Sequence, residues 1–131
     1  SVAPSYIACY SMKEPERFAG AMKALGFFGV SETSEGAAYV TAEYHKLLRE
    51  GTSGNLVTTC CPSFNRLVEI YYPDLVGQLT PVVSPMIAHA RLLKSAHPGV
   101  KVVFAGPCIA KMDEAGDPRH NNEDDGGTGE L

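Results

Sequence analysis

The chain has 131 residues, 44% hydrophobic and 20% charged, a composition typical of one globular domain with its own core. Its net charge of −4 and its scattered basic residues argue against nucleic acid as a partner, because phosphate binding needs clustered Lys and Arg. No apolar run is long enough to span a membrane, and we expect no signal peptide. Because the chain does not begin with Met, we expect that it comes from inside a longer protein.

Four segments have the apolar spacing of amphipathic helices. Pro15, Pro62 and Pro85 each stand where a first helical turn tolerates proline, and Ser84 is a good N-cap for the helix that Pro85 begins. The expected helices cover about 15–25, 35–50, 62–72 and 85–96.

Four short segments, rich in apolar residues, predict strands at 2–10, 27–30, 56–59 and 101–105. Strand and helix alternate, which predicts an α/β fold with a mostly parallel sheet of about four strands and helices on both faces. We expect one domain over 1–115. Residues 116–131 are acidic and Gly-rich, so we expect a linker, a disordered tail or an engineered join there.

The chain has four cysteines. Cys60 and Cys61 are adjacent, and neighbouring cysteines rarely bridge each other, so we expect free thiols and a reducing, cytoplasmic compartment. Cys60-Cys61-Pro62 follows one predicted strand, and Pro107-Cys108 follows another. Carboxyl ends of parallel strands share one edge of a sheet, and a helix N-terminus favours the thiolate form that ligates iron. Cys9, in contrast, ends a predicted strand and is expected in the core.

Two simpler interpretations stay open at this point. Cys60, Cys61 and Cys108 can be small buried hydrophobic residues, as free cysteines often are. Zinc is the other metal to consider, but it usually needs a Cys-x2-Cys pair or suitably spaced histidines. The four histidines lack that spacing, and each is expected on a surface or half-buried helix position: His45, His89, His97 and His120.

The cysteine segments resemble motifs of the iron–iron (FeFe) hydrogenase large subunit. Thr58-Thr59-Cys60-Cys61-Pro62 resembles the first cluster motif, Thr-Ser-Cys-Cys-Pro. Pro107-Cys108-x-x-Lys111-x-x-Glu114 resembles the second, Met-Pro-Cys-x-x-Lys-x-x-Glu. Ala3-Pro4-Ser5 resembles the opening of the same domain, and Ser84-Pro85 a pair that the family places near its cofactor. The resemblance covers residues 1 to about 115 and implies one lobe of the iron-only hydrogenase fold.

The resemblance implies metal ligands. The family's cofactor, the H-cluster, joins a 4Fe-4S cubane to a diiron subsite with cyanide and carbon monoxide ligands. Cys61 and Cys108 resemble cubane ligands. Lys111 and Ser5, with the backbone near Pro4 and Pro107, resemble the groups that hold the cyanides, for which Lys is a charge-assisted donor.

It also implies proton carriers. Cys60 resembles the thiol that exchanges protons with the diiron subsite, and Glu35 and Glu114 resemble carboxylates on the route to solvent. The family's third motif, with the last two cubane cysteines, is absent here, so we expect no complete H-cluster in this chain alone. Replacements of usual family residues are more typical of its sensory branch: Phe64, Gly106, Met86, Ala38 and Thr80.

The sequence therefore predicts part of an oxidoreductase or sensor domain that handles dihydrogen, inactive by itself. The alternatives are a hydrogenase-related iron–sulfur protein in cluster assembly or interaction, and a folded half-domain without activity. Expected partners are the remainder of the H-cluster domain and a ferredoxin-like electron carrier or fused signalling domain. An exposed sheet edge would allow a homodimer.

Overall fold

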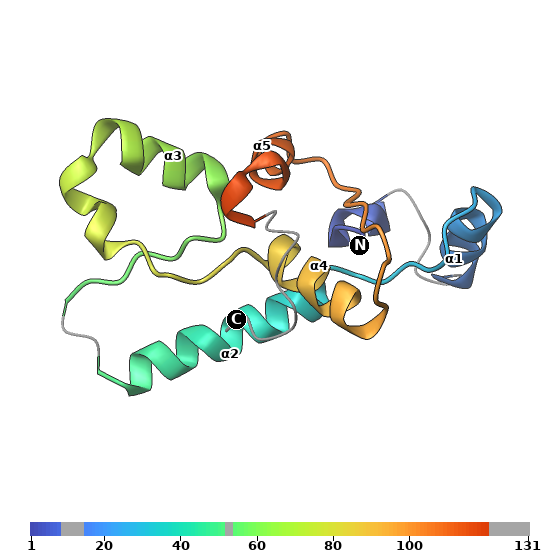
Figure 1. The fold of residues 1–131 in the computed structure, drawn as a ribbon, viewed down its shortest axis with the longest axis horizontal. Helices are drawn as coiled ribbons and strands as arrows, with labels where there is room; N and C mark the ends of the chain where they lie inside the picture. Colours follow the sequence, from blue (N-terminus) through green and yellow to red (C-terminus); the bar gives the residue numbers. More distant parts are fainter. Residues whose placement is uncertain (9–14, 52–53, 121–131) are drawn as a thin grey trace.

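The computed structural model describes residues 1–8, 15–51 and 54–120, in which the regular secondary structure is helical. Helix α1 lies at one end of the molecule and α3 at the other (Figure 1). In chain order the elements are the 3-10 helix η1 (Pro4–Ala8), α1 (Pro15–Ala24), α2 (Ser34–Arg49), α3 (Pro62–Tyr71), the 3-10 helix η2 (Pro73–Gln78), α4 (Pro85–Ala96), α5 (Ala110–Gly116) and the 3-10 helix η3 (Pro118–His120).

All four predicted helices are confirmed, with bounds within one residue of those expected. The predicted cap of α4 is also present: the Ser84 hydroxyl accepts a hydrogen bond from the backbone N–H of Ile87 at 3.5 Å, and Pro85 takes the first helical position. This cap satisfies one of the backbone donors that a helix N-terminus leaves free.

The predicted parallel sheet is wrong. Over residues 1–8, 15–51 and 54–120 there is no β-strand. Three isolated bridges, all parallel, join Val2 to Glu32, Val2 to Ala105, and Val57 to Leu79. The pairing within the described residues therefore does not extend into ladders, and helices dominate the fold.

Two features explain this error. Pro4 has no N–H to donate to a ladder, and it begins η1, so the segment predicted as a strand over 2–10 is extended only to Ala3. Its last two residues, including Cys9, lie outside the described residues. Val103 is 55% exposed, so 101–105 is not the buried strand that its composition predicted. A short apolar run does not by itself distinguish a strand from other partly buried segments.

The first three residues nevertheless join segments that are far apart in the sequence. Val2 N–H donates to the Ser31 carbonyl at 2.9 Å on one side, and Ala3 N–H donates to the Ala105 carbonyl at 2.8 Å on the other. Val2 is buried between these two segments. The start of the chain thus connects the loop before α2 with the segment that leads to Cys108.

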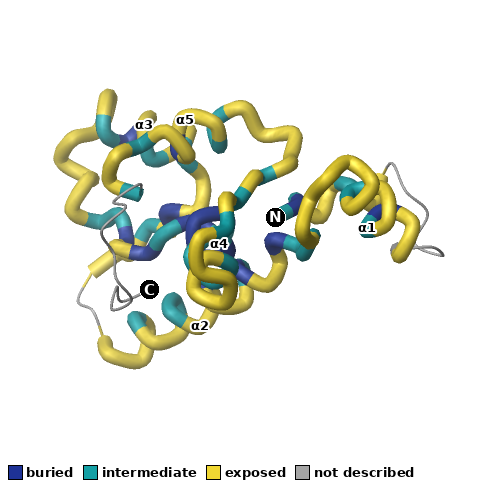
Figure 2. Tube along the Cα trace, turned by 45° about the vertical axis from the view of Figure 1, so that its right-hand side comes forward, coloured by how far each residue is buried: buried dark blue, intermediate teal, exposed yellow. Residues whose placement is uncertain are grey.

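The core lies between α2 and α4, which pack closely (Figure 2). Gly36 allows this approach: a Cβ atom there would overlap the Pro85 carbonyl oxygen and lie 2.7 Å from the His89 Cβ. A larger residue at Gly36 would push the helices apart. The cluster around this contact contains Val40, Val82 and Ala88, with Tyr44, Leu47 and Val83 packed against it.

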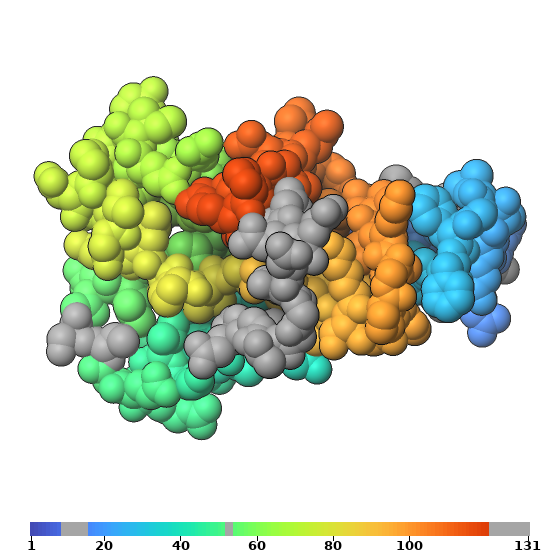
Figure 3. Space-filling model, viewed as in Figure 1, coloured from blue at the N-terminus to red at the C-terminus, as the bar shows by residue number. Residues whose placement is uncertain are grey.

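Helix α5 lies directly against α3, and η3 follows it (Figure 3). The expected tail thus includes the end of α5 and η3, while 121–131 lies outside the described residues, and the domain boundary at 115 stays a prediction. No helix of the described part is long and apolar enough to cross a membrane.

Candidate metal site

Cys60 and Cys61 stand at the N-terminus of α3, exposed and free of disulfide bonds. Cys61 is the N-cap residue, with an extended backbone and no side-chain cap bond, so its thiol is not used to close the helix. Thr59, just before them, is buried, and its N–H donates to the Tyr44 hydroxyl at 3.0 Å. Its hydroxyl lies 3.1 Å from the Thr80 carbonyl oxygen. The core thus anchors the motif while both thiols face outward.

Cys108 stands two residues before α5, also exposed and free. Its carbonyl accepts the N–H of Lys111 at 3.2 Å, which begins the turn into the helix. A cavity of about 200 Å³ is lined by Cys108, Pro107 and Lys111 among others. Gly106 is closely packed, since a Cβ atom there would lie 2.8 Å from the Phe104 ring. Gly106 therefore lies against Phe104 and Ala3 just before the thiol, although residues 105–109 are exposed.

Lys111 joins the two cysteine segments. Its ammonium donates to the Cys60 carbonyl at 3.1 Å and to Glu114 Oε2 at 2.6 Å. Glu114 is buried, and the same oxygen accepts a hydrogen bond from the Ser84 hydroxyl at 3.0 Å. Four predicted site residues, Cys60, Ser84, Lys111 and Glu114, therefore form one hydrogen-bonded group drawn from three parts of the chain.

Other predicted site residues lie elsewhere. Pro4 and Ser5 are exposed in η1, and Pro107 is exposed before Cys108. Glu35 lies on α2, where its carboxylate is 61% exposed and 3.8 Å from the His89 ring. The two carboxylates predicted as proton carriers thus have different partners, Lys111 and Ser84 for Glu114 and an imidazole for Glu35.

The sequence predicted a surface or half-buried position for His89, and that prediction was wrong. Its ring is fully buried on α4. Ser1 Oγ lies 2.8 Å from Nδ1, and Ser31 Oγ lies 3.0 Å from Nε2. Burial lowers the pKa of His89, and the Glu35 carboxylate opposes that shift. In the sequence, burial of His89 is indicated by the apolar run Met86, Ile87 and Ala88 directly before it, whose residues are all buried in the structure.

A cavity of about 340 Å³ adjoins Glu114 and was also not predicted. Its lining includes Thr59, Asn65 and His120. Asn65 Oδ1 and His120 Nδ1 are buried without a hydrogen-bond partner among the described residues, while Asn65 Nδ2 donates to the Thr59 carbonyl at 2.9 Å. A cavity with such groups can hold water that satisfies them.

The donors match an iron–sulfur cofactor in kind. Thiolates are the protein ligands that iron–sulfur clusters use, and three free, exposed thiols stand at the starts of α3 and α5. Lys111 adds a donor suited to an anionic ligand. In the described part, no three His, Cys, Asp or Glu side chains come together as a ready metal site.

Comparison with known proteins gives the family. The model of the iron-only hydrogenase large subunit, C-terminal domain, matches residues 1–126, so the chain belongs to this family, as its motifs predicted. The chain is 29% identical over 111 residues to Iron hydrogenase 1 of Clostridium pasteurianum, covering 76% of this chain and 19% of that protein. It therefore spans about a fifth of that relative. No solved structure matches the chain.

Proposed function

We propose that this chain forms part of a domain that binds an H-cluster and catalyses or senses the reversible oxidation of dihydrogen. The observation that carries the proposal is the contact of Lys111 with the Cys60 carbonyl, because it connects the first cysteine motif to the second. Membership of the iron-only hydrogenase family supports it independently.

Cys61 and Cys108 are the proposed ligands of the 4Fe-4S cubane. Their thiols are exposed and free, as ligation from outside the helices requires. Lys111, Ser5 and the backbone at Pro4 and Pro107 would hold the diatomic ligands of the diiron subsite. The bound cluster supplies the electron transfer and dihydrogen chemistry, and the protein orients it and handles protons.

Cys60 and Glu114 are the proposed proton carriers on the side of Lys111. The ammonium donates to both the Cys60 carbonyl and the Glu114 carboxylate, so it brings the two proposed carriers together. Ser84 donates to the same carboxylate oxygen and fixes its orientation. Glu35 is proposed as a second carrier, exposed to solvent beside His89.

The remainder of the H-cluster domain is the proposed partner, since this chain supplies two of the four cubane ligands. A ferredoxin-like carrier or a fused signalling domain would then exchange electrons or transmit the signal. A cytoplasmic location would keep the thiols reduced. The replacements at Ala38, Thr80 and Met86 favour a sensory protein over a fast enzyme.

The test is anaerobic reconstitution of the chain with iron and sulfide, followed by iron and sulfide analysis and electron paramagnetic resonance. We expect the wild type to take up a cluster that the Cys61→Ser/Cys108→Ser double variant does not. A Cys9→Ser variant is the control and should bind as the wild type does. Equal uptake by the wild type and the double variant would contradict the assignment of these two ligands.

A second assay distinguishes the proposed H-cluster domain from the alternative, an iron–sulfur protein that acts in cluster assembly or interaction. The reconstituted chain is mixed with a synthetic diiron complex that carries cyanide and carbon monoxide, and the infrared bands of these ligands are recorded. Bands shifted by the wild type but less by Lys111→Met support an H-cluster site. Cubane uptake with unshifted bands favours the alternative.

A further inference from the structure

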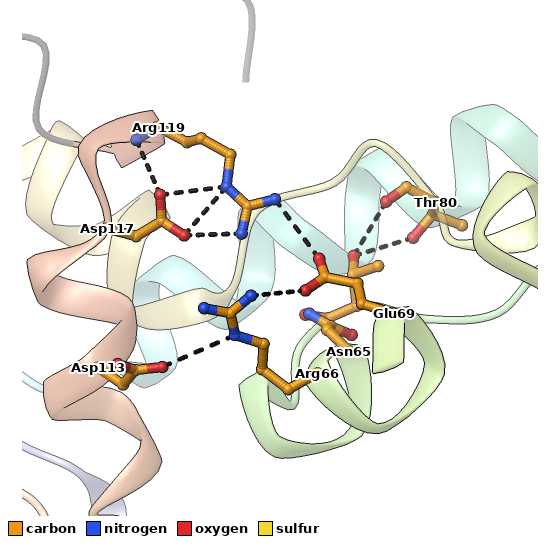
Figure 4. A network of polar contacts seen from close by, with 8 residues as sticks. Asn65, Arg66, Glu69, Thr80, Asp113, Asp117 and Arg119 are labelled. Carbon is orange, nitrogen blue, oxygen red and sulfur yellow. Dashed lines mark hydrogen bonds and ion pairs between the residues drawn. The ribbon is translucent and has the colours of Figure 1, made fainter. Parts of the chain in front are cut away.

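A continuous chain of ion pairs joins α3 to α5 and η3 (Figure 4). Arg66 lies 4.0 Å from Asp113 and 3.0 Å from Glu69, measured between nitrogen and oxygen. Arg119 lies 3.5 Å from Glu69 and 2.7 Å from Asp117. The charges alternate from Asp113 through Arg66, Glu69 and Arg119 to Asp117. We call these five residues the ion-pair chain.

Glu69 is the centre of the ion-pair chain. Each of its oxygens faces a different guanidinium: Oε2 faces Arg66, and Oε1 faces Arg119. Arg119 also holds both oxygens of Asp117, with Nε at 3.1 and 3.0 Å, and this keeps the pKa of that carboxyl well below its usual range. Planar guanidinium groups fix geometry better than a lysine would, because their paired donors match a carboxylate.

The two helices that the ion-pair chain joins are those that present the thiols. Cys61 is the N-cap residue of α3, and Arg66 follows it by five residues. Cys108 precedes α5, and Asp113 likewise follows it by five residues. Lys111 joins the same two segments at the cysteine end through the Cys60 carbonyl. The two segments are therefore joined at two places, by Lys111 at the Cys60 carbonyl and by the ion-pair chain further along both helices.

We propose that Arg66, Glu69 and Arg119 are positioning residues, which hold α3 and α5 so that Cys61 and Cys108 can ligate one cluster. This inference rests on the function proposed above. A single exposed ion pair contributes little, whereas several charges that form a network, as these five do, can act together. Glu69 is the residue to change, because the Glu69→Gln substitution keeps its shape and removes the charge that both arginines share.

The first measurement needs no iron. Spin labels are attached at Cys61 and Cys108, with Cys9 and Cys60 replaced by Ser, and the distance distribution is recorded by pulsed dipolar spectroscopy. Glu69→Gln should broaden the distribution, with far-ultraviolet circular dichroism unchanged. The matched control is Glu43→Gln: Glu43 is similarly exposed, 28% against 26%, and pairs with Lys46 inside α2. Glu43→Gln should leave the distribution unchanged.

High salt provides a second measurement, which weakens the ion pairs in a protein that keeps Glu69. At about 1 M salt the screening length falls to roughly 3 Å, so exposed ion pairs weaken. In salt, the distance distribution of the labelled protein with Glu69 intact should broaden toward the distribution of the Glu69→Gln variant. The distribution of the Glu69→Gln variant should itself change little in salt. An unchanged distribution in salt, or equal widths for Glu69→Gln and Glu43→Gln, would overturn the proposal.

Iron uptake then separates this inference from the function on which it rests. If the chain ligates a cluster, Glu69→Gln should weaken iron binding by roughly 10–100-fold, as loss of an orienting partner does at other metal sites. A broadened distribution without iron uptake by the wild type would keep the role of the ion-pair chain in helix position but reject the proposed cluster. Iron uptake unaffected by Glu69→Gln would reject the positioning role alone.

Discussion

The ammonium of Lys111 lies 2.6 Å from the carboxylate of Glu114, and both side chains are nearly buried, at 13% and 7% exposure. Ser84 donates to the same carboxylate oxygen from the start of α4. A charge withdrawn from water needs such partners, because an unpaired buried charge is strongly unfavourable. The pair therefore connects the second cysteine motif to the core as well as to the first motif.

Removing either member of this pair should destabilise the fold. We expect Lys111→Met or Glu114→Gln alone to lower the free energy of unfolding by about 2–4 kcal/mol, and the double variant to lose less than the sum. Urea denaturation measures all three. Lys46→Met, which breaks an exposed pair within α2, should change stability by about 0.5 kcal/mol or less. Additive losses would show that the two side chains do not depend on each other.

The hydroxyl of Thr59 should be needed to hold the first cysteine motif. It lies 3.1 Å from both the carbonyl and the hydroxyl oxygen of Thr80, in a buried setting. Thr59→Val should lower the free energy of unfolding by about 1–3 kcal/mol, since it leaves buried acceptors without a donor. Thr41→Val is the control, because its hydroxyl bonds to the Ala37 carbonyl on an exposed helix face. Equal losses for the two variants in urea would contradict this account.

Close packing of α2 on α4 should make Gly36 intolerant of a side chain. Gly36→Ala should lower the midpoint of thermal unfolding, because its Cβ would overlap the Pro85 carbonyl and the His89 Cβ; overpacking of this kind typically costs about 1–3 kcal/mol. Gly20→Ala in α1 meets no atom within 4 Å and should raise stability by about 0.5–1 kcal/mol. A neutral Gly36→Ala would mean that the helices lie further apart.

Stability should fall in mild acid because of His89. Burial lowers the pKa of His89 in the folded state below its unfolded value of about 6.5, so the unfolded chain binds the proton more readily. The stabilisation is present above pH about 6.5 and is lost as the pH falls below it, by up to roughly 1.4 kcal/mol per pH unit.

Urea titrations at about pH 7.5 and pH 5.5, on either side of the unfolded pKa, measure this slope. The slope should be smaller in His89→Gln than in the wild type. Identical slopes in the two proteins would show that proton binding at His89 is not linked to folding.

The helices could be predicted from the sequence because their signals are local. For α4, proline in the first turn, the Ser84 cap and the apolar spacing predict the helix up to Ala96 without any distant contact. The sheet could not be predicted in this way, since a strand depends on neighbours along its whole length. Val2 has two parallel neighbours, yet Pro4 begins η1 two residues later and the pairing ends.

The motifs located part of the candidate site. Lys111, Glu114, Ser84 and Cys60 do lie together, but the partner of each depends on how α3, α4 and α5 pack. The same holds for the ion-pair chain: Arg66 and Glu69 form an ordinary helical pair in the sequence, and their contacts with Asp113 and Arg119 exist only in the folded chain. Spacing along a chain does not encode such contacts.

Alkylation of each cysteine, measured by mass spectrometry before and after anaerobic reconstitution with iron and sulfide, tests the central claim most directly. All three described thiols are exposed and should react in the iron-free chain. After reconstitution we predict that Cys61 and Cys108 become protected together while Cys60 stays reactive, and that an iron chelator restores the first pattern. Cys61 and Cys108 reacting as fast with iron as without it would contradict the claim that they ligate one cluster.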